Sequence, residues 1–333
     1  MNKSNTNGAV RLLKKAMQLR EMSLILIIVV MCVVLSITNP FFATTSNLQT
    51  VLGSVAVDGI LTIGMILVML TGGLDLSIGA VMCMSMAIAG KGIQMGMPAI
   101  VALLLGVLAG AVSGLLVGLI VTRLHLSHFI VTLCFMGIAR GIVYAMTSGI
   151  AISLISQMKE NPALSYLGSG YVGGMIPMCF IVFLVLAIAT DIYARKSSVM
   201  RRVYYTGSNE MAAKHSGIKT DRIKVAVCVA CSVMAGIASI IYMSKYNGVT
   251  VSAGEGAEMT ALSAAVIGGV SMNGGKGTIA GGLLGLLFIV LIQDAMNLFS
   301  VQAFWQDLIR YLIVLLAVIL DVLQDKARKK KNS

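Results

Sequence analysis

The chain has 333 residues, of which 58% are hydrophobic and only 11% are charged, and its mean hydropathy is +0.93. A water-soluble domain could not cover so apolar a composition with so few charges, which excludes a soluble protein. The net charge of +12 does not indicate a nucleic-acid partner, because the basic residues lie in alternate loops between apolar stretches.

About ten apolar stretches follow one another, each near the roughly 20 residues that a helix needs to cross a bilayer core of about 30 Å. They cover residues 23–38, 50–70, 76–92, 97–122, 128–147, 175–193, 223–243, 258–272, 277–299 and 305–323. The eighth is short and flanked by glycines, which is typical of a broken or re-entrant segment but also allows a full crossing. The predicted fold class is an all-α, polytopic membrane bundle of about ten transmembrane helices.

The distribution of Lys and Arg residues predicts how the chain is oriented in the membrane. With a cytoplasmic N-terminus, most of the 25 basic residues fall in cytoplasmic segments, and only Lys91, Lys159 and Lys245 fall in outside loops. Both termini are then cytoplasmic. The predicted organisation is a cytoplasmic N-terminal tail over residues 1–22, a transmembrane domain over 23–323 and a basic cytoplasmic tail over 324–333.

Glycines recur every four residues in two stretches, as Gly106, Gly110, Gly114 and Gly118 in the fourth and as Gly277, Gly281 and Gly285 in the ninth. Small residues at this spacing let helix backbones approach one another closely in lipid. The pattern predicts a compact helix bundle.

Polar side chains inside apolar stretches mark either a water-filled path or a paired site. Asp75 follows the second stretch, Arg140 and Tyr144 share one helical face on the fifth, and Gln293 and Asn297 share one on the ninth. We predict that these five residues line a translocation pathway. An internal ion pair that only orients helices, such as Asp75 with Arg140, is the alternative, and the sequence leaves both open.

No catalytic or metal-binding constellation is evident in the sequence. His125, His128 and His215 have no carboxylate or cysteine at metal-ligand spacing. The segment Gly274–Thr278 is rich in glycine, but it lacks the spacing and the Ser or Thr of a phosphate-binding loop. We therefore expect a protein that is not an enzyme and that binds no metal or cofactor itself, so any ATP must be bound by another polypeptide.

One sizeable polar segment, about residues 195–222, lies on the predicted cytoplasmic side. Asn209 is a good helix N-cap, Glu210–Ser216 suits a helix and Gly217 is a natural C-cap, so a short surface helix is expected there. A plain basic loop that only fixes the orientation of the chain is the alternative.

Three sets of motifs resemble one transporter family. They are Thr71–Gly79; Phe129–Leu133 with Ile138–Gly141; and Ala264–Gly269 with Gly274–Thr278 and Trp305-Gln306. Together they resemble the permease subunits of carbohydrate ABC importers of the ribose, xylose and galactose type, within the binding-protein-dependent transport inner membrane component family. The resemblance extends over nearly the whole chain. It implies a multi-pass permease of the bacterial inner membrane that moves a sugar or sugar-like solute.

The resemblance also implies partners and a coupling loop. An ATP-binding subunit would hold the ATP and magnesium, an extracytoplasmic solute-binding protein would deliver the solute, and a second permease subunit, identical or closely related, would complete the pathway. The segment around residues 195–222 would dock on the ATP-binding subunit through Gly207, Asn209, Ala212, Ala213, Ser216 and Gly217.

The chain departs from the family pattern at a few positions. Asp294-Ala295 stands where relatives tend to carry Asn-Gly, Tyr311 stands where Gly is common, and Asp58 is unusual in the second stretch. The solute therefore stays open among an atypical sugar, an autoinducer-like furanose and a nucleoside. An ion-coupled secondary transporter that uses Asp58, Asp75 and Asp294 is the alternative function.

Overall fold

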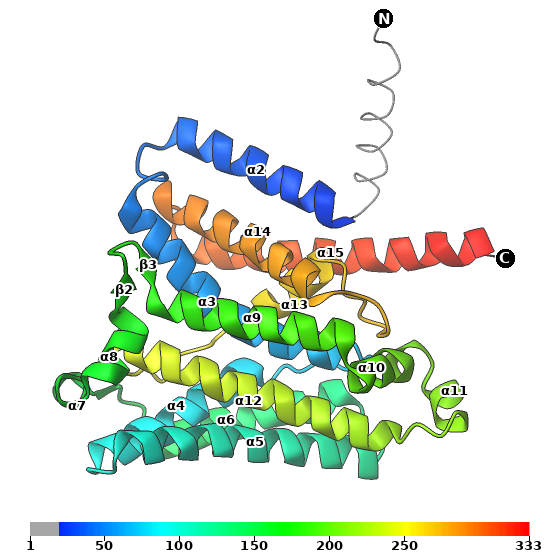
Figure 1. Ribbon diagram of the computed structural model, residues 1–333, viewed down its shortest axis with the longest axis horizontal. Helices are drawn as coiled ribbons and strands as arrows, with labels where there is room; N and C mark the ends of the chain where they lie inside the picture. Colours follow the sequence, from blue (N-terminus) through cyan, green and yellow to red (C-terminus); the bar gives the residue numbers. More distant parts are fainter. Residues whose placement is uncertain (1–19, 333) are drawn as a thin grey trace, which may run out of the picture.

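The computed structural model describes residues 20–332. Most of the predicted N-terminal tail over 1–22, and the last residue of the predicted C-terminal tail, lie outside this part of the chain. Figure 1 shows long helices lying roughly side by side, with shorter elements gathered at the two ends of the bundle. The all-α membrane fold predicted from composition is therefore the fold of the described residues.

Ten helices correspond one to one to the predicted apolar stretches. They are α2 (Arg20–Thr38), α3 (Thr45–Met69), α4 (Ile78–Gln94), α5 (Ala99–Arg123), α6 (His128–Thr147), α9 (Met178–Lys196), α12 (Thr220–Tyr246), α13 (Ala257–Ile267), α14 (Ile279–Leu298) and α15 (Ala303–Asn332). Among the described residues, seven of them (α2, α3, α5, α6, α9, α12 and α14) are long and apolar enough to cross a membrane, whereas α4 and α13 are shorter. The count of about ten crossings stays a prediction.

The shorter elements occupy the two polar regions that the apolar pattern leaves between stretches. On one side lie α7 (Ile155–Glu160), α8 (Pro162–Ser169) and the strands β1 (Ile152–Ser153), β2 (Tyr171–Val172), β3 (Ile176–Pro177) and β4 (Gly248–Val249). Strand β1 pairs antiparallel with β4, and β2 with β3. At the other end lie α10 (Ser198–Ser208) and α11 (Glu210–His215). We call this second end of the bundle the α10 end.

Helix α3 forms the centre of the bundle. Every residue from Gly59 to Thr71 is buried, and the helix packs against α9, α12, α13 and α14. A helix that is apolar on all sides needs protein around it on all sides. By contrast, α5 keeps Ile100, Leu104 and Leu108 exposed, as expected for side chains that face lipid.

The glycines of α5 pack as their spacing predicts. A methyl group placed on Gly106 would lie 2.6 Å from the Ser85 carbonyl oxygen of α4, and one on Gly110 would lie 2.7 Å from the Ser232 carbonyl oxygen of α12. Only glycine permits such close backbone approach. In α14, Gly281 and Gly285 lie as close to the backbone of α13 and of the turn that follows it.

Helix α13 is too short to cross a bilayer. Its 11 residues extend about 16 Å, roughly half of the hydrocarbon core. It begins after Gly256, whose φ is 75°, and ends at Gly268. This short length favours a broken or re-entrant segment at the eighth stretch, which stays a prediction.

The last helix extends further than predicted. Helix α15 continues to Asn332, through most of the tail predicted over 324–333, because no Gly or Pro interrupts residues 303–332.

Candidate functional site

A polar cavity of about 250 Å³ lies among six helices of the bundle and the loop before α13. Its largest polar side chains are Asp58 of α3, Tyr242 of α12, Glu255 of that loop, Gln293 of α14 and Arg310 of α15. Carboxylates accept hydrogen bonds and guanidinium and amide groups donate them. An aromatic ring beside such groups adds an apolar surface. The cavity can therefore hold a small molecule that carries several hydroxyl groups.

Arg310 reaches this cavity because the opposing backbone is glycine. A methyl group on Gly256 would lie 2.8 Å from Nη1 of Arg310, so any larger residue would displace the guanidinium. The same Nη1 lies 3.1 Å from Oδ1 of Asp307. Within the described residues, the buried Nε of Arg310 has no hydrogen-bond partner. Such an unsatisfied donor costs about 1–3 kcal/mol.

Of the five residues predicted to line the pathway, only Gln293 lines this cavity. Tyr144 is exposed on α6, and Asn297 accepts a hydrogen bond of 3.0 Å from Gln306. Arg140 donates to the carbonyl oxygen of Val251 at 3.0 Å. A pathway role for these residues stays a prediction.

The predicted alternative, an ion pair between Asp75 and Arg140, is wrong. Oδ1 of Asp75 accepts hydrogen bonds from the backbone N–H and the hydroxyl of Ser77, at 2.8 and 2.6 Å, and its Oδ2 accepts one from the Cys231 thiol at 3.5 Å. Asp75 is thereby held in the turn before α4, while Arg140 is held by Val251. The two charges are stabilised separately, each by its nearest polar groups.

At the α10 end, helix α10 meets two glycine-containing turns, one after α3 and one between α13 and α14. The backbone N–H of Gly275 donates to the carbonyl oxygen of Leu70 at 3.0 Å, and Gly207 of α10 lies against both of these groups so closely that a methyl group there would overlap the Leu70 oxygen. A methyl group on Gly274 would lie 2.7 Å from the backbone nitrogen of Gly72. Tyr204 of α10 donates to the Gly277 carbonyl oxygen at 3.0 Å. Helix α10 is therefore packed directly on the end of α3 and on the loop between α13 and α14.

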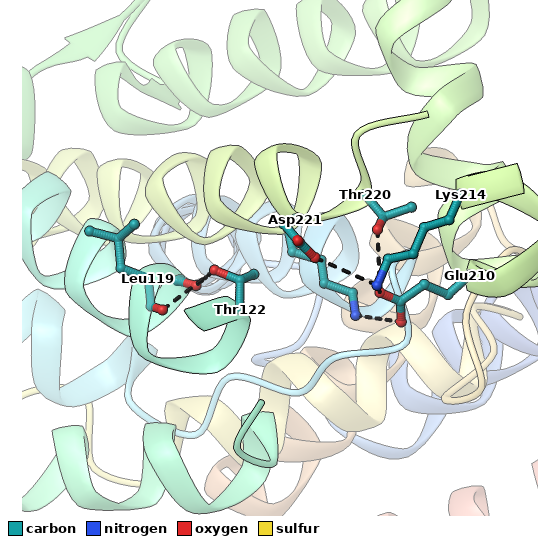
Figure 2. A network of polar contacts seen from close by, with 8 residues as sticks. Leu119, Thr122, Glu210, Lys214, Thr220 and Asp221 are labelled. Carbon is teal, nitrogen blue, oxygen red and sulfur yellow. Dashed lines mark hydrogen bonds and ion pairs between the residues drawn. The ribbon is translucent and has the colours of Figure 1, made fainter. Parts of the chain in front are cut away.

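An ionic network fixes α11 to the start of α12. The Glu210 carboxylate lies 2.7 Å from Nζ of Lys224 and 3.1 Å from Nζ of Lys214, and the Thr220 hydroxyl donates to it at 3.3 Å. Figure 2 shows this carboxylate among its partners, with Asp221 facing Lys214. Burial raises the pKa of Glu210, but the hydrogen bonds from the two lysines outweigh this and lower its pKa overall. The network makes α11 and α12 one unit.

The residues predicted for the coupling loop divide into two groups. Gly207 packs on the bundle, and Ala213 is buried at 4% exposure. Asn209 caps α11, because its Oδ1 accepts the N–H of Ala212 at 3.0 Å. Asn209 is exposed, as are Ala212, Ser216 and Gly217. Gly217 has the left-handed conformation expected of a residue that ends a helix.

Sequence reasoning missed most of the cavity. Asp58 stood out as an unusual carboxylate, but Arg310 was not paired with it. Asp58 and Arg310 carry opposite charges within two apolar stretches, and this could have indicated that they share a site. Each charge is costly in lipid unless it faces a partner or water. Tyr242 and Glu255 carried no such signal.

Comparison with known proteins assigns the chain to a family. Residues 47–318 match the model of the family described as branched-chain amino acid transport system / permease component. The comparison with solved structures gave no significant match.

Several curated relatives are similar over most of their length. The ribose import permease protein RbsC of Bacillus subtilis is 35% identical over 88% of this chain and 89% of its own, and RbsC of Escherichia coli K12 is 33% identical over 93% and 96%. The autoinducer 2 import system permease protein LsrC of Photorhabdus luminescens is 30% identical over 93% and 92%. This chain therefore belongs to the branched-chain amino acid transport system / permease component family, as a multi-pass protein of the bacterial cytoplasmic membrane.

Proposed function

We propose that this permease is the membrane-spanning subunit of an ATP-driven importer for a sugar or sugar-like solute, with both termini and the α10 end on the cytoplasmic side. The observation that carries the proposal is the packing of α10 on the end of α3 through Gly207. A transport subunit that is driven by a separate ATP-binding subunit needs a surface element that is rigidly joined to its core.

The solute class is supported by the relatives and by the cavity. The family description names branched-chain amino acids, whereas the similar proteins are named for ribose, L-arabinose and autoinducer 2 import. An aliphatic side chain would require an apolar pocket. The cavity instead offers Asp58, Glu255, Gln293 and Arg310, which suit a hydroxylated solute better.

Helix α3 links the two sites. Asp58 lies 12 positions before Leu70, which corresponds to about 18 Å along a helix. Movement of α10 would be transmitted through Gly207 to the end of α3, and the buried helix would carry it to the cavity. This chain's own residues thus hold the solute and convey movement, while ATP and magnesium would be bound by a partner subunit.

The exposed residues Ala212, Ser216 and Gly217 are the proposed contact with the ATP-binding subunit. Because α11 is fixed to α12 by Glu210 and its lysine partners, a push on α11 would move α12, which also lines the cavity through Tyr242. A second permease subunit would complete the pathway, and an extracytoplasmic binding protein would deliver the solute.

Gentle detergent purification of the tagged chain from its native membranes tests the proposal, with mass spectrometric identification of the proteins that accompany it. We expect an ATP-binding subunit with the wild-type chain, and its loss with Ala212→Arg. Gly137→Ala is the matched control, because Gly137 is exposed on α6 with open space around it. A chain that purifies alone, and that transports in liposomes under an ion gradient, would instead support the secondary transporter.

A further inference from the structure

An apolar groove of about 650 Å³ separates α9 from α12 at the α10 end. Figure 1 shows α9 and α12 as neighbours in this view, with α10 following the end of α9, and residues of all three helices line the groove. Of the residues that line the groove, only Thr190, Tyr193 and Arg222 carry polar groups. Its volume lies within the range of about 300–1,000 Å³ that is usual for ligand sites.

A basic pocket adjoins this groove. The pocket measures about 500 Å³ and is lined by residues of α10, of the turn after α11 and of the start of α12. That turn includes Ser216 and Gly217, so a ligand in the pocket would lie beside the proposed contact with the ATP-binding subunit. Its charged side chains are Arg202, Lys219 and Arg222, and no acidic residue lines it. Arg222 and Ile223 line both the groove and the pocket. The two spaces therefore form one site with an apolar body and a cationic mouth.

The three cations are free to bind an anion. Within residues 20–332, none of these three side chains forms an ion pair with a carboxylate. The neighbouring carboxylates form ion pairs with other basic side chains instead. Asp191 lies 2.7 Å from Arg195, and the Glu210 carboxylate lies 2.7 Å from Lys224.

The site lies where a membrane surface is expected. Helix α9 ends at Lys196 and α12 begins at Thr220, so the mouth is level with the ends of two spanning helices. Tyr193, half exposed at the groove, is a residue type enriched at membrane–water boundaries. Helix α10 buries Met200 and Val203 against the bundle and exposes Arg201 and Arg202.

We propose that this site binds an anionic phospholipid of the surrounding membrane. An acyl chain of the lipid lies in the groove between α9 and α12, and its phosphate group lies at Arg202, Lys219 and Arg222. The proposal is independent of the solute. A lipid bound there contacts Val199, Met200 and Val203 of α10 and so stabilises the position of the helix that carries Gly207.

Native mass spectrometry of the delipidated full-length chain tests this site, with phosphatidylglycerol and phosphatidylcholine of identical acyl chains added separately. We expect preferential retention of phosphatidylglycerol, weakened about tenfold or more in the double variant R202Q/R222Q, since each basic residue near an anionic lipid contributes appreciably to binding. The matched control is R201Q, which removes a neighbouring charge on α10 that lines neither space.

A second variant, Ala230→Phe, fills the groove without changing charge, and it is expected to reduce retention of both lipids. Equal binding of the two lipids by the wild-type chain, or unchanged phosphatidylglycerol binding by R202Q/R222Q, would overturn the proposal. So would competition by soluble glycerol phosphate at the same concentration, which would indicate a site for a free anion. Loss of an accompanying protein subunit from R202Q/R222Q with unchanged lipid binding would identify a protein docking site instead.

Discussion

The cavity around Asp58 and the contact around Gly207 both involve α3, yet they are packed in opposite ways. At the cavity, polar side chains from six elements surround a space of about 250 Å³, and one buried donor, Nε of Arg310, has no partner among the described residues. At Gly207 there is no room even for a methyl group.

This difference assigns solute binding to the cavity and the transmission of movement to the contact at Gly207. Close-packed backbone deforms little, so a displacement applied at one side appears at the other. A cavity lined by polar side chains leaves room for a ligand that forms hydrogen bonds with them. The same buried helix connects a region suited to conveying force with a region suited to holding a solute.

The largest expected effect follows from filling the close contact. In Gly207→Val, the side chain would overlap the Leu70 carbonyl oxygen and separate α10 from α3. We expect ATP-driven uptake in proteoliposomes to fall by about a hundredfold, which corresponds to about 2.7 kcal/mol, while the partner subunit still hydrolyses ATP. Gly137→Val serves as the control, because the space around Gly137 is open. Uptake within twofold of wild type would show that this contact does not transmit movement.

A smaller effect is expected at the cavity. Asp58→Asn replaces a charged hydrogen-bond acceptor beside the solute with a neutral amide. Because this weakens the hydrogen bond to the solute, we expect KM for uptake to rise about tenfold, equal to roughly 1.4 kcal/mol. Asp294→Asn makes the same chemical change at a buried carboxylate that hydrogen-bonds to Asn47 and does not line the cavity. If both variants change KM equally, the cavity is not the solute site.

The smallest effect is expected in the network that fixes α11. Glu210→Gln should lower the thermal stability of the purified chain by an amount equivalent to about 0.5–1 kcal/mol, as is usual for partly exposed ion pairs. Because the pKa of Glu210 is lowered on folding, this contribution is fully present above the ordinary glutamate value of 4.5 and is lost as the pH falls through the lowered pKa.

Thermal unfolding of wild type and Glu210→Gln at pH 7 and near pH 3 measures this difference. The two proteins should differ at pH 7 and converge at low pH. A constant difference at both values would show that the network acts through packing and not through charge.

The sequence predicted the helices well because lipid imposes a simple requirement. A spanning segment must satisfy its own backbone and present apolar side chains, and these properties can be read locally. The glycine spacing in α5 was equally informative, since helical period alone places Gly106 and Gly110 on one face.

The candidate sites were less predictable. Asp75 and Arg140 were natural candidates because each is a charge within or beside an apolar stretch. Their actual partners, Ser77 for the first and Val251 for the second, depend on short local turns and on a carbonyl more than a hundred residues away. Arg310 reaches the cavity only because Gly256 opposes it, and no local pattern indicates that pair.

What the sequence by itself determined is the class of protein, its apolar helices, the polar segment with its Asn209 cap and the motifs of its family, because each depends on composition or on residues close in the chain. Which polar residues share a cavity, and that Gly207 of α10 meets the turns at Gly72 and Gly275, was decided only by the tertiary structure. The physical reason is that contacts between distant helices depend on close packing of the whole bundle, to which every neighbouring side chain contributes.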